Sequence, residues 1–215
     1  MVSAVCIVGK SKVGKTTLVE QLISEFKGRG YRVAAVKHAS EELDIDTPGK
    51  DTWRFARAGS DAVLASSDSR LAFIKNTERD SSIGEILRII GGGVDLVLIE
   101  GFKKGKAPKI EVHRKELGGE LVCPPAVLSA VASDEPLDID VPQFPLGDIK
   151  GIADFIQDNF ISQGKSDISL WVNGEWVPTS PFVRQIITKT ILGMVSTLKG
   201  LGKIRSLDIS IRNKP

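Results

Sequence analysis

Short apolar runs alternate with amphipathic segments from Val2 to Phe160. The apolar runs predict strands over Val2–Val8, Arg32–Val36, Asp61–Ser66, Leu71–Lys75, Asp95–Ile99, Lys109–His113 and Ala126–Val131. Apolar residues at helical spacing predict helices over Thr16–Phe26, Thr52–Ala58, Ile83–Ile90 and Gly147–Phe160. Strands that alternate with helices in this way are typical of an α/β fold. We therefore predict a mostly parallel sheet that is flanked by helices.

The pattern changes beyond residue 162, where Gln163–Ser166 is a polar linker. Two short apolar runs then flank Asn173-Gly174, which is the strongest short signal for a β-hairpin. The segments that follow predict a second unit with a hairpin, a helix and a strand, over Ile168–Pro178, Phe182–Leu198 and Lys203–Ile211. We therefore predict two domains, an α/β domain over residues 1–162 and a small ββαβ unit over residues 168–215.

Composition narrows the classes of function. The 215 residues include 29 basic and 27 acidic side chains, and this balance argues against a dedicated nucleic-acid or anionic-membrane binder. Two cysteines, Cys6 and Cys123, provide neither a disulfide framework nor a zinc cluster, and Cys6 is expected to be a small buried residue. Val2–Val8 is too short to span a membrane and lacks the basic flank of a signal peptide. We expect a cytoplasmic protein.

One motif carries a strong chemical signal. Residues 9–16 read GKSKVGKT and match the phosphate-loop pattern G-x-x-x-x-G-K-[ST] between a predicted strand and a predicted helix. Its glycines let the loop turn its amides inward around an anion. Lys15 would reach the β and γ phosphates, and the Thr16 hydroxyl would ligate Mg²⁺. The predicted phosphate site comprises Gly9, Lys10, Ser11, Lys12, Val13, Gly14, Lys15, Thr16 and Thr17.

A magnesium site also needs a carboxylate near the phosphate loop. Glu100 follows the strand Asp95–Ile99 at the edge of the sheet where α/β proteins bind ligands, so we assign it to the metal. Asp95 lies at the other end of that strand, roughly 15 Å away, and is expected to be structural. The loop after the second strand offers a further carboxylate, which we assign to Asp51, with Asp44 and Asp46 as alternatives.

The histidines and the base site give weaker signals. His38 is interpreted as a hydrogen-bonded loop residue rather than an acid or base, and His113 as structural. The [NT]KxD sequence with which common GTPases read guanine is absent. Asp134, at the end of a late strand, is a candidate acceptor for guanine N1 and N2, with a structural strand-end turn as an equal alternative.

These motifs resemble the molybdopterin-guanine dinucleotide biosynthesis protein B (MobB) family. The resemblance rests on the phosphate loop Gly9–Thr17, on DLVLIEGFK over Asp95–Lys103, on VKHASEELDIDTPGKDTWRFARAGSDAVL over Val36–Leu64, and on AVASDEPLDIDV and GIADFI within Ala130–Ile156. It implies a P-loop protein that binds GTP, a weak GTPase and a homodimer. It also implies an accessory role beside the guanylyltransferase that joins GMP to molybdopterin, with molybdopterin itself as a further candidate ligand.

Two features of this chain depart from the family pattern. Family members often carry more histidines after the first, where this chain has Ser40-Glu41-Glu42, and short members lack the segment 168–215.

Two other functions are alternatives to the one that the resemblance implies. A small-molecule kinase or ligase similar to dethiobiotin synthetase is the main alternative. Such enzymes pair a phosphate loop with a lysine after the second strand, the position of Lys37, which we add to the nucleotide site. A nickel metallochaperone GTPase would need Cys or His ligands, of which the sequence offers few.

Overall fold

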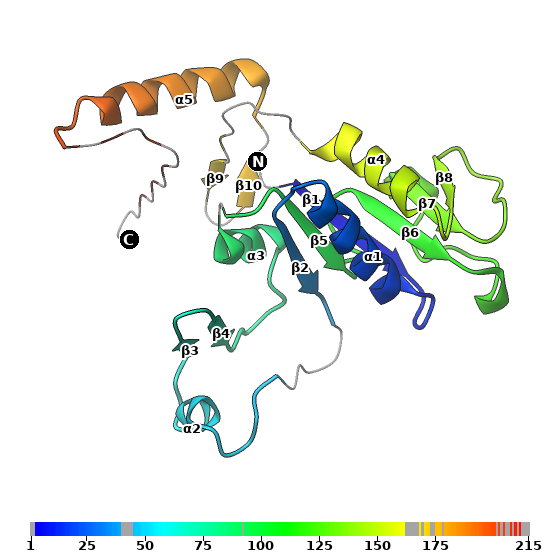
Figure 1. Ribbon diagram of the computed structural model, residues 1–215, viewed down its shortest axis with the longest axis horizontal. Helices are drawn as coiled ribbons and strands as arrows, with labels where there is room; N and C mark the ends of the chain where they lie inside the picture. The colour runs from blue at the N-terminus through cyan, green and yellow to red at the C-terminus, as the bar shows by residue number, and fades with distance from the viewer. Residues whose placement is uncertain are drawn as a thin grey trace.

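The computed structural model describes residues 3–39, 45–91, 93–161, 168, 170–172, 175–177, 179–200, 202, 204, 207, 209 and 211. Six strands form one sheet in the order β2-β5-β1-β6-β7-β8, and every neighbouring pair in it is parallel (Figure 1). The strands are β1 (Ser3–Gly9), β2 (Val33–Lys37), β5 (Leu96–Glu100), β6 (Lys109–His113), β7 (Ala130–Ser133) and β8 (Gln143–Pro145). The predicted α/β architecture is confirmed.

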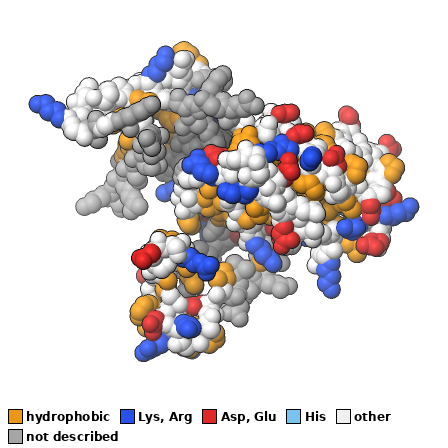
Figure 2. Space-filling view, in the orientation of Figure 1, with side chains coloured by type: hydrophobic (Ala, Val, Ile, Leu, Met, Phe, Trp, Pro, Cys, Tyr) orange, Lys and Arg blue, Asp and Glu red, His pale blue; other side chains and the backbone are white. Residues whose placement is uncertain are grey.

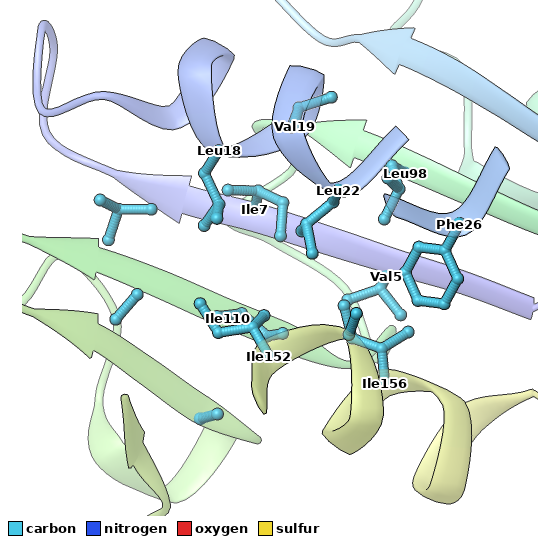
Figure 3. Close-up of a cluster of buried hydrophobic side chains, with 14 of the residues drawn as sticks. Val5, Ile7, Leu18, Val19, Leu22, Phe26, Leu98, Ile110, Ile152 and Ile156 are labelled. Atoms are coloured by element: carbon cyan, nitrogen blue, oxygen red, sulfur yellow. The ribbon is translucent and has the colours of Figure 1, made fainter. Parts of the chain in front are cut away.

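Both faces of this sheet are buried, which explains why β1 and β5 are almost wholly apolar. Helices α1 (Lys15–Gly28) and α4 (Ile149–Phe160) pack on one face. Figure 3 shows this core, in which Leu22 and Phe26 of α1 and Ile156 of α4 lie close to Val5 of β1. On the other face, Cys6 and its neighbours pack against partly buried residues of α3 (Ile83–Ile90).

The position of β1 indicates where the sheet could bind a ligand. Strand β1 lies between β5 and β6, so the chain moves to one side of it for β2 and β5 and to the other side for β6, β7 and β8. Parallel sheets bind ligands at the carboxyl ends of the strands, where the strand order reverses in this way. The phosphate loop leaves β1 at this point.

A small lobe follows β2. Helix α2 (Asp51–Arg57) and the antiparallel pair of β3 (Ala62–Ser66) and β4 (Leu71–Lys75) form it. Figure 1 shows this lobe below the main sheet and apart from it. The loop after β2 therefore leads away from the sheet before the chain returns through α3.

The last part of the chain contains the antiparallel pair of β9 (Leu170–Val172) and β10 (Glu175–Val177) and the helix α5 (Pro181–Ser196). The predicted hairpin strands are thus confirmed, while the Asn173-Gly174 turn lies outside the described residues. The strand predicted over Lys203–Ile211 also falls mostly outside them, and its four described residues belong to no strand. None of the helices in the described ranges has the length and apolar character needed to span a bilayer.

One predicted boundary between β6 and α4 needs correction, and one strand there was not predicted. The strand predicted over Ala126–Val131 begins only at Ala130, because Pro125–Val127 forms a 3-10 turn. Proline fixes φ and lacks an amide donor, so Pro124-Pro125 favours a turn over a strand. The short strand β8 was not predicted, since it has only three residues and ends at a proline, which is tolerated at a sheet edge.

Candidate functional site

The backbone of the phosphate loop requires its glycines. Gly9 has φ of 145°, and a Cβ there would lie 2.5 Å from the carbonyl oxygen of Val112 on β6. Gly14, which precedes α1, has φ of 105°. Val13 is buried beneath the loop and anchors it to the core. These residues give a turn at the start of α1 of the kind in which backbone amides can bind an anion.

Lys15 lies over the phosphate loop. Its Nζ donates to the carbonyl oxygens of Lys10 at 2.6 Å and Gly9 at 3.3 Å. Partial burial lowers the pKa of this amine, while the Glu100 carboxylate opposes the shift and the nearby Lys103 and Lys37 add to it. An anion in the loop would relieve this cost by pairing with the ammonium group, so Lys15 suits a phosphate ligand.

Thr16 and Glu100 meet as the sequence predicts. The Thr16 hydroxyl donates to the Glu100 carboxylate at 2.9 Å. The pairing of β5 with both neighbours aligns Glu100 with Ile7 of β1 and with Lys37 of β2. Hydroxyl and carboxylate oxygens are the donors that Mg²⁺ prefers, so these two side chains fit a magnesium ion beside the phosphate loop.

Backbone hydrogen bonds join the end of β5 to both neighbouring strands, β2 and β1. The His38 amide donates to the Glu100 carbonyl at 2.9 Å, and the Gly101 amide donates to the Ile7 carbonyl at 2.9 Å. The His38 ring lies 4.1 Å from the Phe102 ring and 3.0 Å from the Asp80 carboxylate. His38 is therefore a hydrogen-bonded loop residue in this structure, and the contacts hold Glu100 at the sheet edge.

The two described loop acids that the sequence offers for the metal, Asp46 and Asp51, make other contacts. Asp46 accepts hydrogen bonds from the Thr47 amide and the Thr52 hydroxyl, each at 2.9 Å. Asp51 begins α2 and lies 3.6 Å from Arg54, with most of its side chain exposed. Asp51 is part of the separate lobe that contains α2 (Figure 1), Asp46 precedes that lobe, and Asp44 lies outside the described residues. The structure brings Glu100 to Thr16 but does not bring Asp51 there.

Asp134 lies at the end of β7, close to the phosphate loop. Its carboxylate accepts a hydrogen bond from the Lys115 amide at 2.8 Å and lies 4.0 Å from the Arg114 guanidinium. Arg114 itself donates through Nε to the Val13 carbonyl of the phosphate loop at 3.0 Å. Sequence reasoning missed Arg114. The available signal was its position directly after β6, the neighbour of β1 at the ligand-binding edge.

Asp95, His113 and Cys6 make structural contacts or are buried. Asp95 forms hydrogen bonds with Arg32 at 2.6 and 3.1 Å, which lower the pKa of its carboxyl group. His113 is buried 3.1 Å from Glu135. Burial raises the pKa of the Cys6 thiol to about 11, so it stays protonated near neutral pH. Across the part of the chain that the structure describes, no three His, Cys, Asp or Glu side chains are grouped to hold a metal ion.

Comparison with known proteins identifies the family. The family model of "Molybdopterin guanine dinucleotide synthesis protein B", MobB, matches residues 4–134. This chain belongs to the MobB family. It is 40% identical over 152 residues to the molybdopterin-guanine dinucleotide biosynthesis adapter protein of Haemophilus influenzae, covering 70% of this chain and 85% of that protein.

Two further matches show the extent of the likeness. A crystal structure of molybdopterin-guanine biosynthesis protein B is 28% identical, with a TM-score of 0.56 over 72% of this MobB chain and 98% of that one. A putative molybdopterin-guanine dinucleotide biosynthesis adapter protein from Methanocaldococcus jannaschii is 28% identical over an alignment of 235 residues, which covers 95% of this chain and 95% of that protein. The alignment with this archaeal protein therefore extends into the C-terminal segment of this chain.

Proposed function

We propose that this MobB-family protein binds GTP with Mg²⁺ and assists the formation of the guanine dinucleotide form of molybdopterin. The observation that carries the proposal is the hydrogen bond of 2.9 Å from the Thr16 hydroxyl to the Glu100 carboxylate. Thr16 directly follows Lys15, whose amine lies over the phosphate loop. The relatives' names support the pathway, since they are molybdopterin-guanine dinucleotide biosynthesis adapter proteins. They favour this function over a small-molecule kinase or ligase of the dethiobiotin synthetase type.

Each part of the site has a role in this proposal. The amides of residues 13–17 and the Lys15 ammonium bind the phosphates. Thr16 and Glu100 hold Mg²⁺, which supplies positive charge beside the phosphate oxygens. Lys37 is aligned with Glu100 across β2 and β5 and adds a cation at the same edge. The protein would act beside the guanylyltransferase, with molybdopterin as a candidate second ligand.

A reconstituted reaction tests this function. Purified guanylyltransferase, molybdopterin, GTP and Mg²⁺ are incubated with and without this protein, and the guanine dinucleotide product is measured by chromatography. The wild-type protein should raise the yield, whereas Lys15→Ala should not. Lys27→Ala, which removes an equal charge from the exposed end of α1, should behave as the wild type. A yield that is independent of the added protein would contradict the accessory role.

The protein is also proposed to form a homodimer through the lobe of α2, β3 and β4. Phe55, Leu64 and Leu71 of this lobe are each more than half exposed, and Figure 2 shows hydrophobic side chains on its surface. A two-stranded sheet is marginal in water unless another surface covers it. Exposed apolar residues on such a pair of strands indicate an interface. In a symmetric dimer, the lobe of each copy would cover the lobe of the other.

Sedimentation analysis tests the dimer. Leu71→Glu places a charge on the exposed lobe without touching the main core, so the variant should sediment as a monomer while the wild type sediments as a dimer. Ile89→Glu is the matched control, because Ile89 is a similarly exposed apolar residue on α3. A Leu71→Glu protein that remains dimeric would exclude this lobe as the interface.

A further inference from the structure

The carboxyl ends of β6 and β7 present a charged pair beside the phosphate loop. His113 of β6 and Ser133 of β7 are aligned, so the residues that follow them, Arg114 and Asp134, are neighbours across the sheet edge. The two side chains are 39% and 36% exposed, and their Nη1 and Oδ2 atoms are 4.0 Å apart. The pair is therefore fixed near the proposed nucleotide and open to a ligand.

The backbone holds Asp134 in place. The Lys115 amide donates to Oδ1 of Asp134 at 2.8 Å. The turn after β7 is fixed by Ser133, whose hydroxyl donates to the Glu135 carbonyl at 2.7 Å and accepts from the Glu135 amide at 3.1 Å. A carboxylate has about four acceptor positions, so Asp134 can still accept from a ligand, chiefly through Oδ2.

Arg114 connects this position to the phosphate loop. Its Nε donates to the Val13 carbonyl at 3.0 Å, and its Nη2 lies 3.7 Å from the point where a Cβ on Gly14 would be. Within the described part of the chain, neither terminal nitrogen of Arg114 makes a hydrogen bond. A guanidinium group carries five N–H donors, so four of them remain for a ligand.

A donor group next to an acceptor group matches one purine. Guanine presents its O6 acceptor next to the N1–H and N2–H₂ donors, so an arginine can donate to O6 while a carboxylate accepts from N1 and N2. Adenine presents an N6–H₂ donor at the O6 position and an N1 acceptor, which would face the arginine donors and the carboxylate with the wrong polarity.

We propose that Arg114 and Asp134 form a guanine-reading pair, in which Arg114 donates to O6 and Asp134 accepts from N1–H and N2–H₂. The inference rests on the proposed binding of GTP at the phosphate loop and adds the residues that select the base. Because Arg114 also holds Val13, one side chain links base recognition to the phosphate loop.

Competition titrations of the full-length protein test the pair. GTP, ATP and xanthosine triphosphate compete for the site in the wild type, Arg114→Ala, Asp134→Asn and the control Lys115→Ala. Arg114→Ala should reduce the preference for GTP over ATP by about tenfold or more, the discrimination expected of one well-placed polar side chain. Asp134→Asn replaces an acceptor by a donor and should shift preference toward xanthine, whose C2 carbonyl replaces the amino group. Lys115→Ala should leave both ratios unchanged.

The outcomes separate this inference from the function on which it rests. A wild type that binds no nucleotide would refute the proposed function. A wild type that binds GTP and ATP equally would refute the guanine-reading pair alone. An equal loss of GTP and ATP affinity in Arg114→Ala would show that Arg114 only braces the phosphate loop. If circular dichroism shows that Arg114→Ala does not fold, the Asp134→Asn titration decides. An unchanged ratio of the affinities for xanthosine triphosphate and GTP in Asp134→Asn would overturn the proposal.

Discussion

Replacing Gly101 by alanine should disturb the junction that holds Glu100 at the site. Gly101 has φ of 98°, and a Cβ there would lie 2.7 Å from the carbonyl oxygen of His38 and 3.3 Å from its Cβ. The first distance is shorter than a side-chain carbon and a backbone oxygen tolerate, so the end of β2 would have to move. The change therefore combines an unfavourable backbone conformation with a steric clash.

The two effects can be separated by a second glycine. A left-handed conformation costs an L-residue about 1–2 kcal/mol, and overpacking typically costs about 1–3 kcal/mol. Gly105 has nearly the same φ, 100°, but no atom of the described residues lies within 4 Å of the position that a Cβ would take there. Gly105→Ala should therefore cost only the backbone contribution, while Gly101→Ala should cost about 2–5 kcal/mol, the sum of the two effects.

Urea unfolding measures both values. The free energies of unfolding come from midpoints at constant m-value, and the difference between the two variants isolates the clash with His38. Gly101→Ala should also weaken Mg²⁺-dependent GTP binding. The hydrogen bond from the Gly101 amide to the Ile7 carbonyl and the one from the His38 amide to the Glu100 carbonyl would both shift. Equal destabilisation by the two substitutions would refute the claim that close packing at this junction excludes a side chain.

Three further predictions concern the metal, pH and the C-terminal segment. Glu100→Gln should weaken Mg²⁺ dependence and hydrolysis more than nucleotide binding, since it removes charge but keeps shape; an unchanged Mg²⁺ titration would make Glu100 structural. Hydrogen bonds from Arg79 and Ser82 lower the pKa of Glu85 to about 2 from 4.5, so their stabilisation is full above about pH 4.5 and is lost as pH falls toward 2. Urea unfolding near pH 5 and near pH 3 should show this loss in the wild type and not in Glu85→Gln. Truncation after Gly164 should preserve GTP binding and weaken assembly with the guanylyltransferase; a folded truncated protein that cannot bind GTP would contradict the domain division.

Much of the site follows from local patterns. The strand, glycine-rich loop and helix from Ser3 to Gly28 are contiguous, so hydrophobic periodicity and the glycine positions predict them together. The meeting of Thr16 with Glu100 follows from topology, because the carboxyl ends of neighbouring parallel strands share one edge. The same argument predicts a structural role for Asp95 at the other end of β5, and its bonds to Arg32 confirm it.

Other features depend on tertiary structure that local patterns do not encode. Nothing in the composition of the loop after β2 indicates that it leads into a separate lobe, which carries Asp51 away from Thr16. A single arginine at a strand end is typical of a solvent-exposed position. The position of Arg114 directly after β6 became informative only once the pairing of β1 with β6 placed it against Val13. Long-range strand order, rather than residue type, decides both cases.

Calorimetric titration of GTP with Mg²⁺ into the wild-type protein and into Lys15→Ala tests the central claim most directly. Lys15 contacts the loop carbonyls of Gly9 and Lys10 and contributes no core packing, so the variant should fold with the secondary structure of the wild type. The account predicts binding to the wild type with one nucleotide per chain and loss of tight binding in Lys15→Ala. Undiminished GTP affinity in a folded Lys15→Ala protein would contradict the assignment of the nucleotide site to the phosphate loop.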